Sequence, residues 1–308
     1  MTTPQHELPV PKLGVGLAYQ APLRGFIETS SNAFDFLEVV PDILWTDRGP
    51  GQRPRYRDDP AGTAFLRQVR ERMPVIPHSI GLSIGSAHRF DSEHVEQIER
   101  WREWLDFPWH SDHLSYSVAE HVEGDGEVNA GFTMPLPLDR ESLELVATRA
   151  AQVRARIPLP FLIENNVYYV RLAERELDEA DFLNALSKRA GCWLLLDLHN
   201  IYVNGRNHDF DPRAFLERLD LSRVAELHVA GGMEHDGFYL DSHSGPTPDS
   251  VRDLLEWVLP RCPNVGGVVF ELVGSWFESM GEEGLRTELA TLRAAWARHQ
   301  PAPEGVAA

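Results

Sequence analysis

The chain has 308 residues, of which 43% are hydrophobic and 25% are charged, and its formal net charge is -18. Such a composition is typical of a globular protein, and no apolar run approaches the roughly 18 residues that a transmembrane helix requires. The negative charge disfavours nucleic acid as a partner and favours cationic peptides or metal cations. The N-terminal stretch lacks the basic and apolar regions of a signal peptide, so we expect a cytoplasmic protein without a membrane segment.

Eight short apolar runs follow one another along the chain and alternate with segments of helical periodicity. The runs cover 13–19, 34–40, 74–81, 107–115, 160–165, 192–200, 224–231 and 265–273. The helical segments cover 141–157, 178–190, 211–219, 248–259 and 281–299. Apolar strands that alternate with helices indicate a parallel sheet covered by helices, and eight such units predict a TIM (β/α)8 barrel.

The barrel is predicted to occupy residues 1–300 as a single domain. A disordered tail is expected over 301–308, and a long polar loop over 49–60. The two cysteines, Cys192 and Cys262, lie beside apolar runs and form no C-x-x-C pattern. We therefore expect buried thiols and neither a disulfide framework nor a zinc–thiolate site.

Acidic and histidine residues gather at the C-terminal ends of the apolar runs, which is the edge where barrel enzymes build their active sites. They are His78, His113, Glu164, Asp197 with His199 and Asn200, Glu226, His228 and Glu271. Asp241 and His243 follow the seventh run in FYLDSHSGPTP, and an Asp-x-His pair on extended backbone has both side chains on one face. The same alternation places His199 on the face of Asp197, whereas His110 and His113 face opposite ways.

So many carboxylates and imidazoles around one opening would shift one another's pKa values away from the charged forms. Metal cations remove this conflict, because each side chain then becomes a ligand. Mixed histidine and carboxylate ligation suits iron, zinc or manganese and does not suit calcium or magnesium. Glu226 is compatible with direct ligation or with holding an imidazole in place.

Several of these stretches resemble the multinuclear non-heme iron-dependent oxidases, the family that includes the methanobactin biosynthesis oxidase. The resemblance is carried by HSIGLSIGS, SDHLSYS, MPLPLDRESLELV, FLIENN, GCWLLLDLHNIYVNGRNHDFD, ELHVAGG, DSH and FE. It implies a barrel of the xylose-isomerase-like metalloenzyme superfamily. The implied metal ligands are His78, His113, Glu164, Asp197, Asn200, His228, Asp241, His243 and Glu271. His199 and Glu226 would support them.

The resemblance further implies an oxidoreductase with two or three irons, ferrous and ferric, and dioxygen as co-substrate. Such enzymes modify a Cys, Asn or Asp residue of a ribosomally synthesised precursor peptide in natural-product biosynthesis, with a small partner protein that binds the leader. For substrate binding we expect Asn165, Asn204 and Arg55. Arg55 belongs to the polar loop, where its cation could pair with a peptide carboxylate.

Three other functions share parts of this pattern. A zinc or manganese hydrolase acting on nucleic acid uses the same ligand order, but the acidic charge and Asn200, where such endonucleases tend to have histidine, argue against it. A sugar isomerase or epimerase would place two divalent ions at the same edge. A scaffold that has kept a metal site without activity is disfavoured by the complete ligand set.

Overall fold

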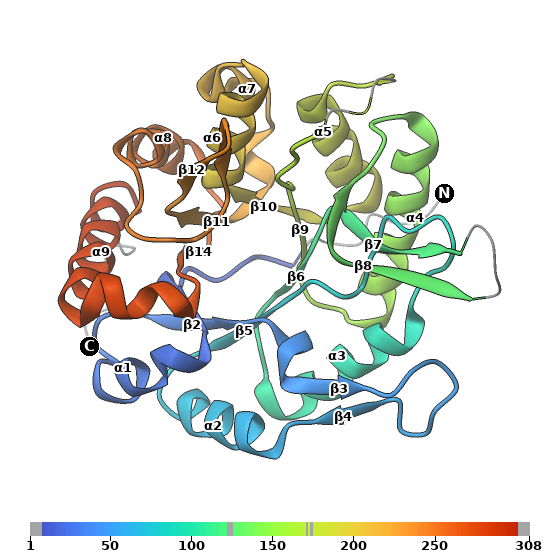
Figure 1. Ribbon diagram of the computed structural model, residues 1–308, viewed down its shortest axis with the longest axis horizontal. Helices are drawn as coiled ribbons and strands as arrows, with labels where there is room; N and C mark the ends of the chain where they lie inside the picture. Colours follow the sequence, from blue (N-terminus) through green and yellow to red (C-terminus); the bar gives the residue numbers. More distant parts are fainter. Residues whose placement is uncertain (1–7, 122–125, 171, 173–174, 301–308) are drawn as a thin grey trace.

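Eight parallel strands close into a barrel in the computed structural model, which describes residues 8–121, 126–170, 172 and 175–300 (Figure 1). The order around the barrel is β1-β14-β11-β10-β9-β6-β5-β2. Their bounds are β1 Gly14–Ala18, β2 Phe36–Val39, β5 Val75–Ser79, β6 His110–His113, β9 Phe161–Glu164, β10 Trp193–Asp197, β11 Val224–Ala230 and β14 Gly267–Glu271. Each lies within one of the eight apolar runs, so the predicted TIM barrel is confirmed.

Helices surround the barrel and cover its outer face (Figure 1). They are α1 Arg24–Thr29, α2 Pro60–Arg70, α3 Ser92–Leu105, α4 Arg140–Arg156, α5 Glu179–Ala190, α6 Leu198–His208, α7 Pro212–Glu217, α8 Asp249–Val258 and α9 Phe277–His299. Short 3-10 helices cover Ala21–Leu23, Pro41–Leu44, Leu221–Arg223, Leu259–Arg261 and Gly274–Trp276. The five predicted helical segments correspond to α4, α5, α7, α8 and α9.

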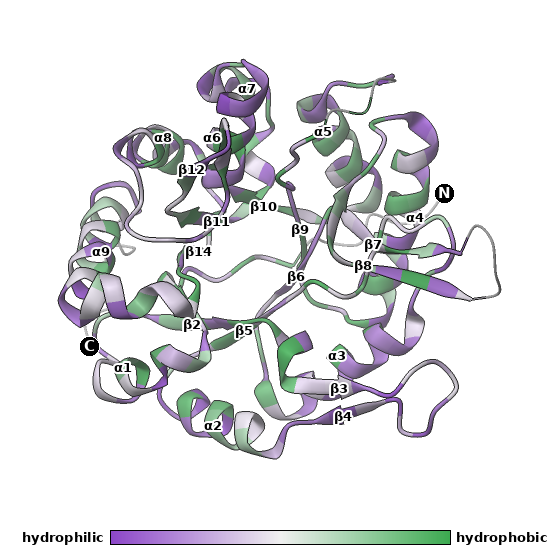
Figure 2. Cartoon of the chain, viewed as in Figure 1, coloured by the Kyte–Doolittle hydropathy of each residue, from purple (hydrophilic) through white to green (hydrophobic). Residues whose placement is uncertain are grey.

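The helices are amphipathic, and each carries hydrophobic and hydrophilic residues (Figure 2). In α8, the buried residues Val251, Leu254, Leu255 and Val258 recur every three or four positions, which places them on the face that packs inward. No helix among the described residues is long and apolar enough to cross a membrane. The disordered tail predicted for 301–308 lies outside the described residues.

Three two-stranded sheets extend from loops beyond the C-terminal ends of the barrel strands. They pair β3 (Trp45–Asp47) with β4 (Tyr56–Asp58), β7 (Ser115–Glu120) with β8 (Glu127–Pro135), and β12 (Met233–His235) with β13 (Phe238–Leu240). The expected polar loop over 49–60 is therefore wrong in part. Its second half forms β4, and Asp59 then caps α2 by accepting the backbone N–H groups of Ala61 and Gly62.

Aromatic rings fill the N-terminal end of the barrel. The Phe36 and Trp109 rings meet edge to face with centroids 5.9 Å apart. A Cβ on Gly16 or Gly267 would lie 2.5 or 2.6 Å from the Phe36 ring, so the ring requires both glycines. Cys192 and Cys262 are fully buried, as predicted. Because apolar rings occupy this end, the acidic and histidine residues inside the barrel lie toward its C-terminal end.

Candidate metal centre

Seven of the eight barrel strands carry an acidic or histidine residue at, or within two residues of, their C-terminal end, and each of these residues is at least largely buried. They are Glu38 of β2, His78 of β5, His113 of β6, Glu164 of β9, Asp197 of β10, His228 of β11 and Glu271 of β14. The parallel register pairs His113 with Glu164, Asp197 with His228, and Ala230 with Glu271. Their backbones therefore reach the same level of the barrel, and their side chains gather at its C-terminal end.

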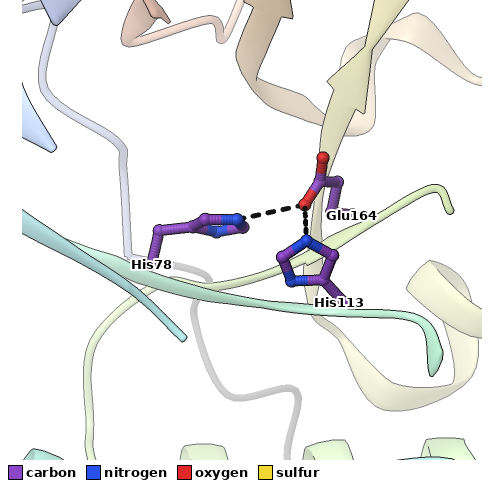
Figure 3. A group of neighbouring side chains, drawn as sticks. All are labelled: His78, His113 and Glu164. Carbon is purple, nitrogen blue, oxygen red and sulfur yellow. Dashed lines mark ion pairs between the residues drawn. The ribbon is translucent and has the colours of Figure 1, made fainter. Parts of the chain in front are cut away.

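The first group consists of His78, His113 and Glu164 (Figure 3). The Nε2 atoms of both imidazoles lie 3.1 Å from the same oxygen, Oε2 of Glu164. The Nδ1 atom of His113 lies 3.1 Å from the carbonyl oxygen of Ser79, and that of His78 lies 2.8 Å from Oγ of Ser111. A carbonyl oxygen only accepts, so Nδ1 of His113 carries the hydrogen and its Nε2 presents a lone pair to the carboxylate.

Burial lowers the pKa of both His78 and His113, which favours the neutral imidazoles. The lone pair of His113 that faces this carboxylate oxygen repels it unless a cation lies between them. This nitrogen and oxygen donor set, with both remote nitrogens already bonded, is the arrangement found around protein-bound transition metals. The three residues therefore fit a metal ion.

The second group, Glu164, Asp197 and His228, lies deeper in the barrel. Its ligand atoms are within 4.8 Å of one another. Burial raises the pKa of Glu164 to about 7 against the opposing effect of His113 and His228. Burial and the charge of Asp241 raise the pKa of Asp197 to about 7 as well. Both shifts express the cost of packing carboxylates together without a cation.

The third group consists of Asp197, His243 and Glu271, with Asp241 beside it. The Nε2 atom of His243 lies 2.9 Å from Oδ1 of Asp241 and 3.8 Å from Oε2 of Glu271. Burial would lower the pKa of His243, but these carboxylates raise it to about 10. Burial likewise opposes ionisation of Asp241, yet His243 and His199 hold its pKa well below the usual range.

The three groups form a chain, because Glu164 belongs to the first and second groups and Asp197 to the second and third. Several buried atoms in or beside the chain have no hydrogen-bond partner among the described residues. They are Oε2 of Glu164 and Nδ1 of His228 within the groups, and Oδ1 of Asn200 on the neighbouring helix α6. Shared carboxylates and unpartnered donor atoms are what a cluster of two or three bridged metal ions would use.

His199 and Asn200 belong to α6 and not to a strand, so the alternation argument for His199 is wrong. Strand β10 ends at Asp197, whose side chain accepts the backbone N–H of Asn200 at 2.9 Å and begins the helix. His199 is fully buried, and its Nδ1 lies 2.8 Å from Oδ1 of Asp241. This contact places it behind Asp241. Asn200 donates its Nδ2 to the carbonyl oxygen of Asn165, which leaves its own Oδ1 free for the centre.

Asn165 and Asn204 do not have the free amides that a substrate-binding role needs. Asn165 is fully buried, accepts the Asp197 N–H at 2.8 Å and donates to the Asp197 carbonyl at 3.1 Å. Asn204 accepts the Tyr168 N–H and donates to the carbonyl of Asn166. Asn165 therefore positions the backbone of a predicted ligand, and Asn204 holds a neighbouring loop.

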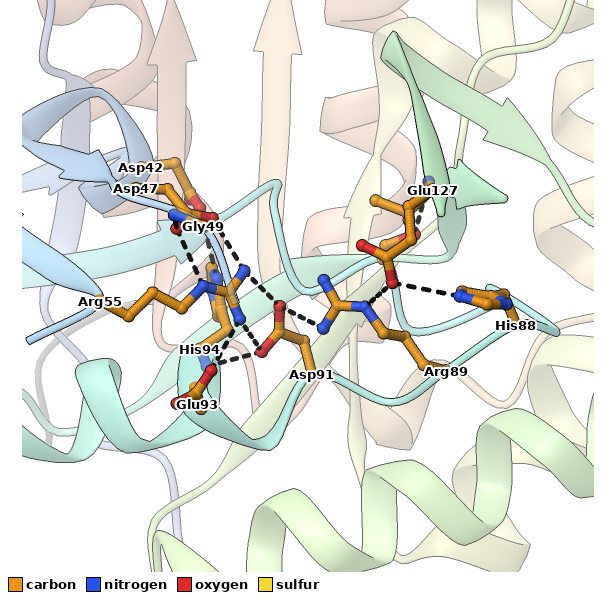
Figure 4. A network of polar contacts seen from close by, with 12 residues as sticks. Asp42, Asp47, Gly49, Arg55, His88, Arg89, Asp91, Glu93, His94 and Glu127 are labelled. Carbon is orange, nitrogen blue, oxygen red and sulfur yellow. Dashed lines mark hydrogen bonds and ion pairs between the residues drawn. The ribbon is translucent and has the colours of Figure 1, made fainter. Parts of the chain in front are cut away.

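Arg55 is also committed to other contacts, which corrects its predicted role. Only 6% of the residue is exposed, and its guanidinium lies between Asp47 at 2.8 Å and Asp91 at 2.8 Å, with Glu93 at 3.3 Å (Figure 4). A guanidinium paired with three carboxylates has no capacity for a peptide carboxylate. It connects the β3–β4 hairpin to the N-terminus of α3, where Asp91 is the capping residue.

Glu226 and Glu38 form a layer beneath the three groups. Oε2 of Glu226 accepts the indole N–H of Trp109 at 2.8 Å, and burial raises the Glu226 pKa well above its ordinary value. Glu38 contacts His228 and was not among the predicted site residues. Its signal was present, because Glu38 interrupts the apolar run over 34–40 as the other site residues interrupt theirs.

A small cavity opens beside the third group. It is lined by Ala18, Tyr19, Gln20, Glu38, Val39, Val40, His243, Glu271 and Leu272. The side chains of His243 and Glu271 are 22% and 13% exposed, whereas those of His78 and Glu164 are each 3% exposed. His113 of the first group is 16% exposed. A ligand can therefore reach the third group and His113, whereas His78 and Glu164 are closed to it.

A parallel barrel with chained histidine and carboxylate groups at its C-terminal end defines a metal-dependent TIM-barrel enzyme. Residues 14–276 match the family described as RiPP precursor modification enzyme MbnB/TglH/ChrH, and the chain belongs to this family. The family resemblance deduced from the sequence motifs is thus confirmed.

Relatives match most of the chain, and solved structures share its fold. A UPF0276 protein of Caulobacter vibrioides is 32% identical over 285 residues, which cover 92% of this chain and 94% of that one. A UPF0276 protein of Rhizorhabdus wittichii is 34% identical, with coverage of 77% and 79%. Among solved structures, D-psicose 3-epimerase from Clostridium cellulolyticum has a TM-score of 0.55 at 12% identity, with coverage of 93% and 98%. This last similarity shows the barrel fold alone.

Proposed function

We propose that the protein is a multinuclear iron-dependent oxidase that uses dioxygen to modify a Cys, Asn or Asp residue of a ribosomally synthesised precursor peptide in the cytoplasm. The observation that carries the proposal is the chain of three groups joined through Glu164 and Asp197. A mononuclear hydrolase would need one group only. Mixed nitrogen and oxygen donors favour iron over magnesium or calcium, and the family supplies the peptide substrate.

The side chains of the centre would direct donor atoms inward and balance charge. Iron, when bound, would supply the activation of dioxygen and a position for the substrate's thiolate or carboxylate. Ser79 and Ser111 fix the rings of His113 and His78, so that the Nε2 atoms point to the centre. Glu164 would bridge neighbouring positions, and its proton would leave when a cation takes its place.

Exposed apolar side chains on the loops around the barrel opening favour a peptide as the ligand. Ile80, Tyr169, Val170, Phe238 and Val273 are each at least 36% exposed and follow four different barrel strands. The hydroxyl of Tyr169 accepts the Asp241 N–H at 3.0 Å, and its ring packs against Phe238 with centroids 6.2 Å apart. Apolar surface beside a polar centre suits an extended peptide better than a free sugar.

The test begins with protein purified without oxygen, whose metals are quantified and examined by Mössbauer spectroscopy. More than one iron per chain is expected. The iron-loaded protein is then incubated in air with the short precursor peptide encoded beside its gene, with and without a small neighbouring partner protein that would hold the leader. Mass spectrometry should detect a mass change at one residue of the peptide, and Glu164→Gln should abolish it. An unmodified peptide together with sugar interconversion or nucleic-acid cleavage would refute the proposal.

A further inference from the structure

Glu38 is a carboxylate buried in the middle of a barrel sheet, where an uncompensated charge costs several kcal/mol. It lies on β2, in register with Ala18 of β1 and Ile76 of β5, and only 2% of it is exposed. Both of its oxygens face Nε2 of His228, with Oε1 at 3.2 Å and Oε2 at 3.3 Å. His228 is fully buried. The imidazole is therefore the hydrogen-bond partner of the carboxylate.

The other nitrogen of His228 faces the centre. Nδ1 lies 3.3 Å from Oε2 of Glu271 and 3.9 Å from Oε1 of Glu164, and it has no hydrogen-bond partner among the described residues. In His78 and His113 the roles of the nitrogens are reversed, because there Nδ1 is held and Nε2 faces Glu164. In each of the three strand histidines, one ring nitrogen therefore contacts a protein group and the other faces the centre, where it could bind a metal ion.

We infer that Glu38 is a positioning residue for the centre: it accepts the Nε2–H of His228 and so fixes the tautomer whose Nδ1 lone pair can bind a metal ion. The inference rests on the proposed metal centre and adds a residue to it. A carboxylate that accepts the remote N–H of a ligating histidine orients the ring and makes it a stronger donor. No other described group bonds the Nε2 atom of His228.

Glu38, Glu226 and His228 also lie close enough to hold a cation themselves, and the geometry argues against this use. One oxygen of Glu226 already accepts the Trp109 indole at 2.8 Å. A cation at Nε2 would also turn the lone pair of His228 away from the centre, so that the group of Glu164 and Asp197 would lose its only imidazole. A positioning role for Glu38 agrees with the contacts of both Nε2 of His228 and Oε2 of Glu226.

The experiment measures binding of zinc, a diamagnetic probe, by competition with a chelator. Glu38→Leu removes the acceptor, and we expect it to weaken binding on the order of 10–100-fold. Glu38→Gln keeps an amide oxygen that can accept the Nε2–H, and it should restore much of the affinity at unchanged stoichiometry. Glu288→Leu is the matched control, because Glu288 is an equally buried carboxylate, 2% exposed, that pairs with Arg252 of α8.

Nitrogen NMR of histidine-labelled, zinc-loaded protein reads the tautomer directly. His228 should carry its hydrogen on Nε2 in the wild type and in Glu38→Gln, and this signature should be lost in Glu38→Leu. Unchanged zinc affinity in Glu38→Leu, with Glu288→Leu folded, would overturn the inference. So would the loss of one whole zinc equivalent in Glu38→Gln, which would make Glu38 a ligand. Zinc data as expected beside an unmodified peptide would reject the oxidase and leave the role of Glu38 standing.

Discussion

Replacing Glu164 by Gln should stabilise the metal-free protein and destabilise the metal-loaded protein. In the metal-free protein the carboxyl is fully buried, and its pKa is raised from the ordinary 4.5 to about 7. With metal bound, the same carboxylate would serve as a metal ligand, because it belongs to two of the three groups. In the metal-free protein the substitution removes the cost of burying a carboxylate. In the metal-loaded protein it would remove a ligand shared by two groups. The effect of Glu164→Gln on the free energy of unfolding should therefore change sign on metal binding.

The size of the first effect follows from the pKa shift. The unfolded chain releases the Glu164 proton near pH 4.5 and the folded chain near pH 7. The stability contributed by this group is fully present below pH 4.5 and is lost as the pH rises through 7. At about 1.4 kcal/mol per pKa unit, the loss reaches about 3 kcal/mol above pH 7. Gln does not titrate, so Glu164→Gln escapes this loss.

Urea denaturation of chelator-treated protein at about pH 5 and about pH 8 measures the effect. The free energy of unfolding of Glu164→Gln, relative to wild type, should rise by about 3 kcal/mol between the two conditions. Glu288→Gln, which removes the charge of a buried carboxylate that pairs with the half-buried Arg252, should be destabilised at both. A difference between wild type and Glu164→Gln that does not change with pH would refute the reasoning, as would a stabilised variant in the presence of metal.

Four further substitutions test other parts of the centre. Asp241→Ala or His243→Ala should lower the metal content measured by elemental analysis and leave the circular dichroism spectrum intact, because both residues lie outside the barrel strands; wild-type metal content would exclude them as ligands. Asn200→His should shift preference from iron toward zinc in competitive loading, since the free Oδ1 of Asn200 is replaced by an imidazole. Asn165→Ala should cost about 1–3 kcal/mol in urea denaturation and lower metal affinity, because both backbone groups of Asp197 lose their partner.

The barrel and most of the centre could be predicted because both follow from local pattern. An apolar run that ends in a polar residue locates the C-terminal end of a strand, and closure of the barrel then brings those ends together. This pattern was sufficient to predict His78, His113 and Glu164 as site residues. Glu38 was harder to predict as a site residue, because the same apolar run also contains Asp35. The pattern does not tell which of the two acids points into the barrel. The structure pairs Asp35 with Val15 N–H and Arg293 on the outside.

Other residues depended on information that a local pattern does not contain. The role of Arg55 is decided by Asp91, 36 residues further along the chain, and Asp91 takes part because it caps α3. His199 was placed by strand alternation, but the strand ends two residues earlier when Asp197 accepts the Asn200 N–H. That capping contact changes the period of the backbone from 2 to 3.6 and turns His199 toward Asp241.

The three groups of the centre also differ in whether strands or loops supply their residues. Strands fix the first and second groups, and their register leaves little freedom to Glu164 or Asp197. The third group instead receives His243 from a loop, where the residue adopts a left-handed backbone conformation with φ of 46°. It is also the group that borders the cavity. Two groups fixed by strands, beside a third that borders a cavity, are the arrangement expected when strands hold a cluster and a loop leaves room for a ligand.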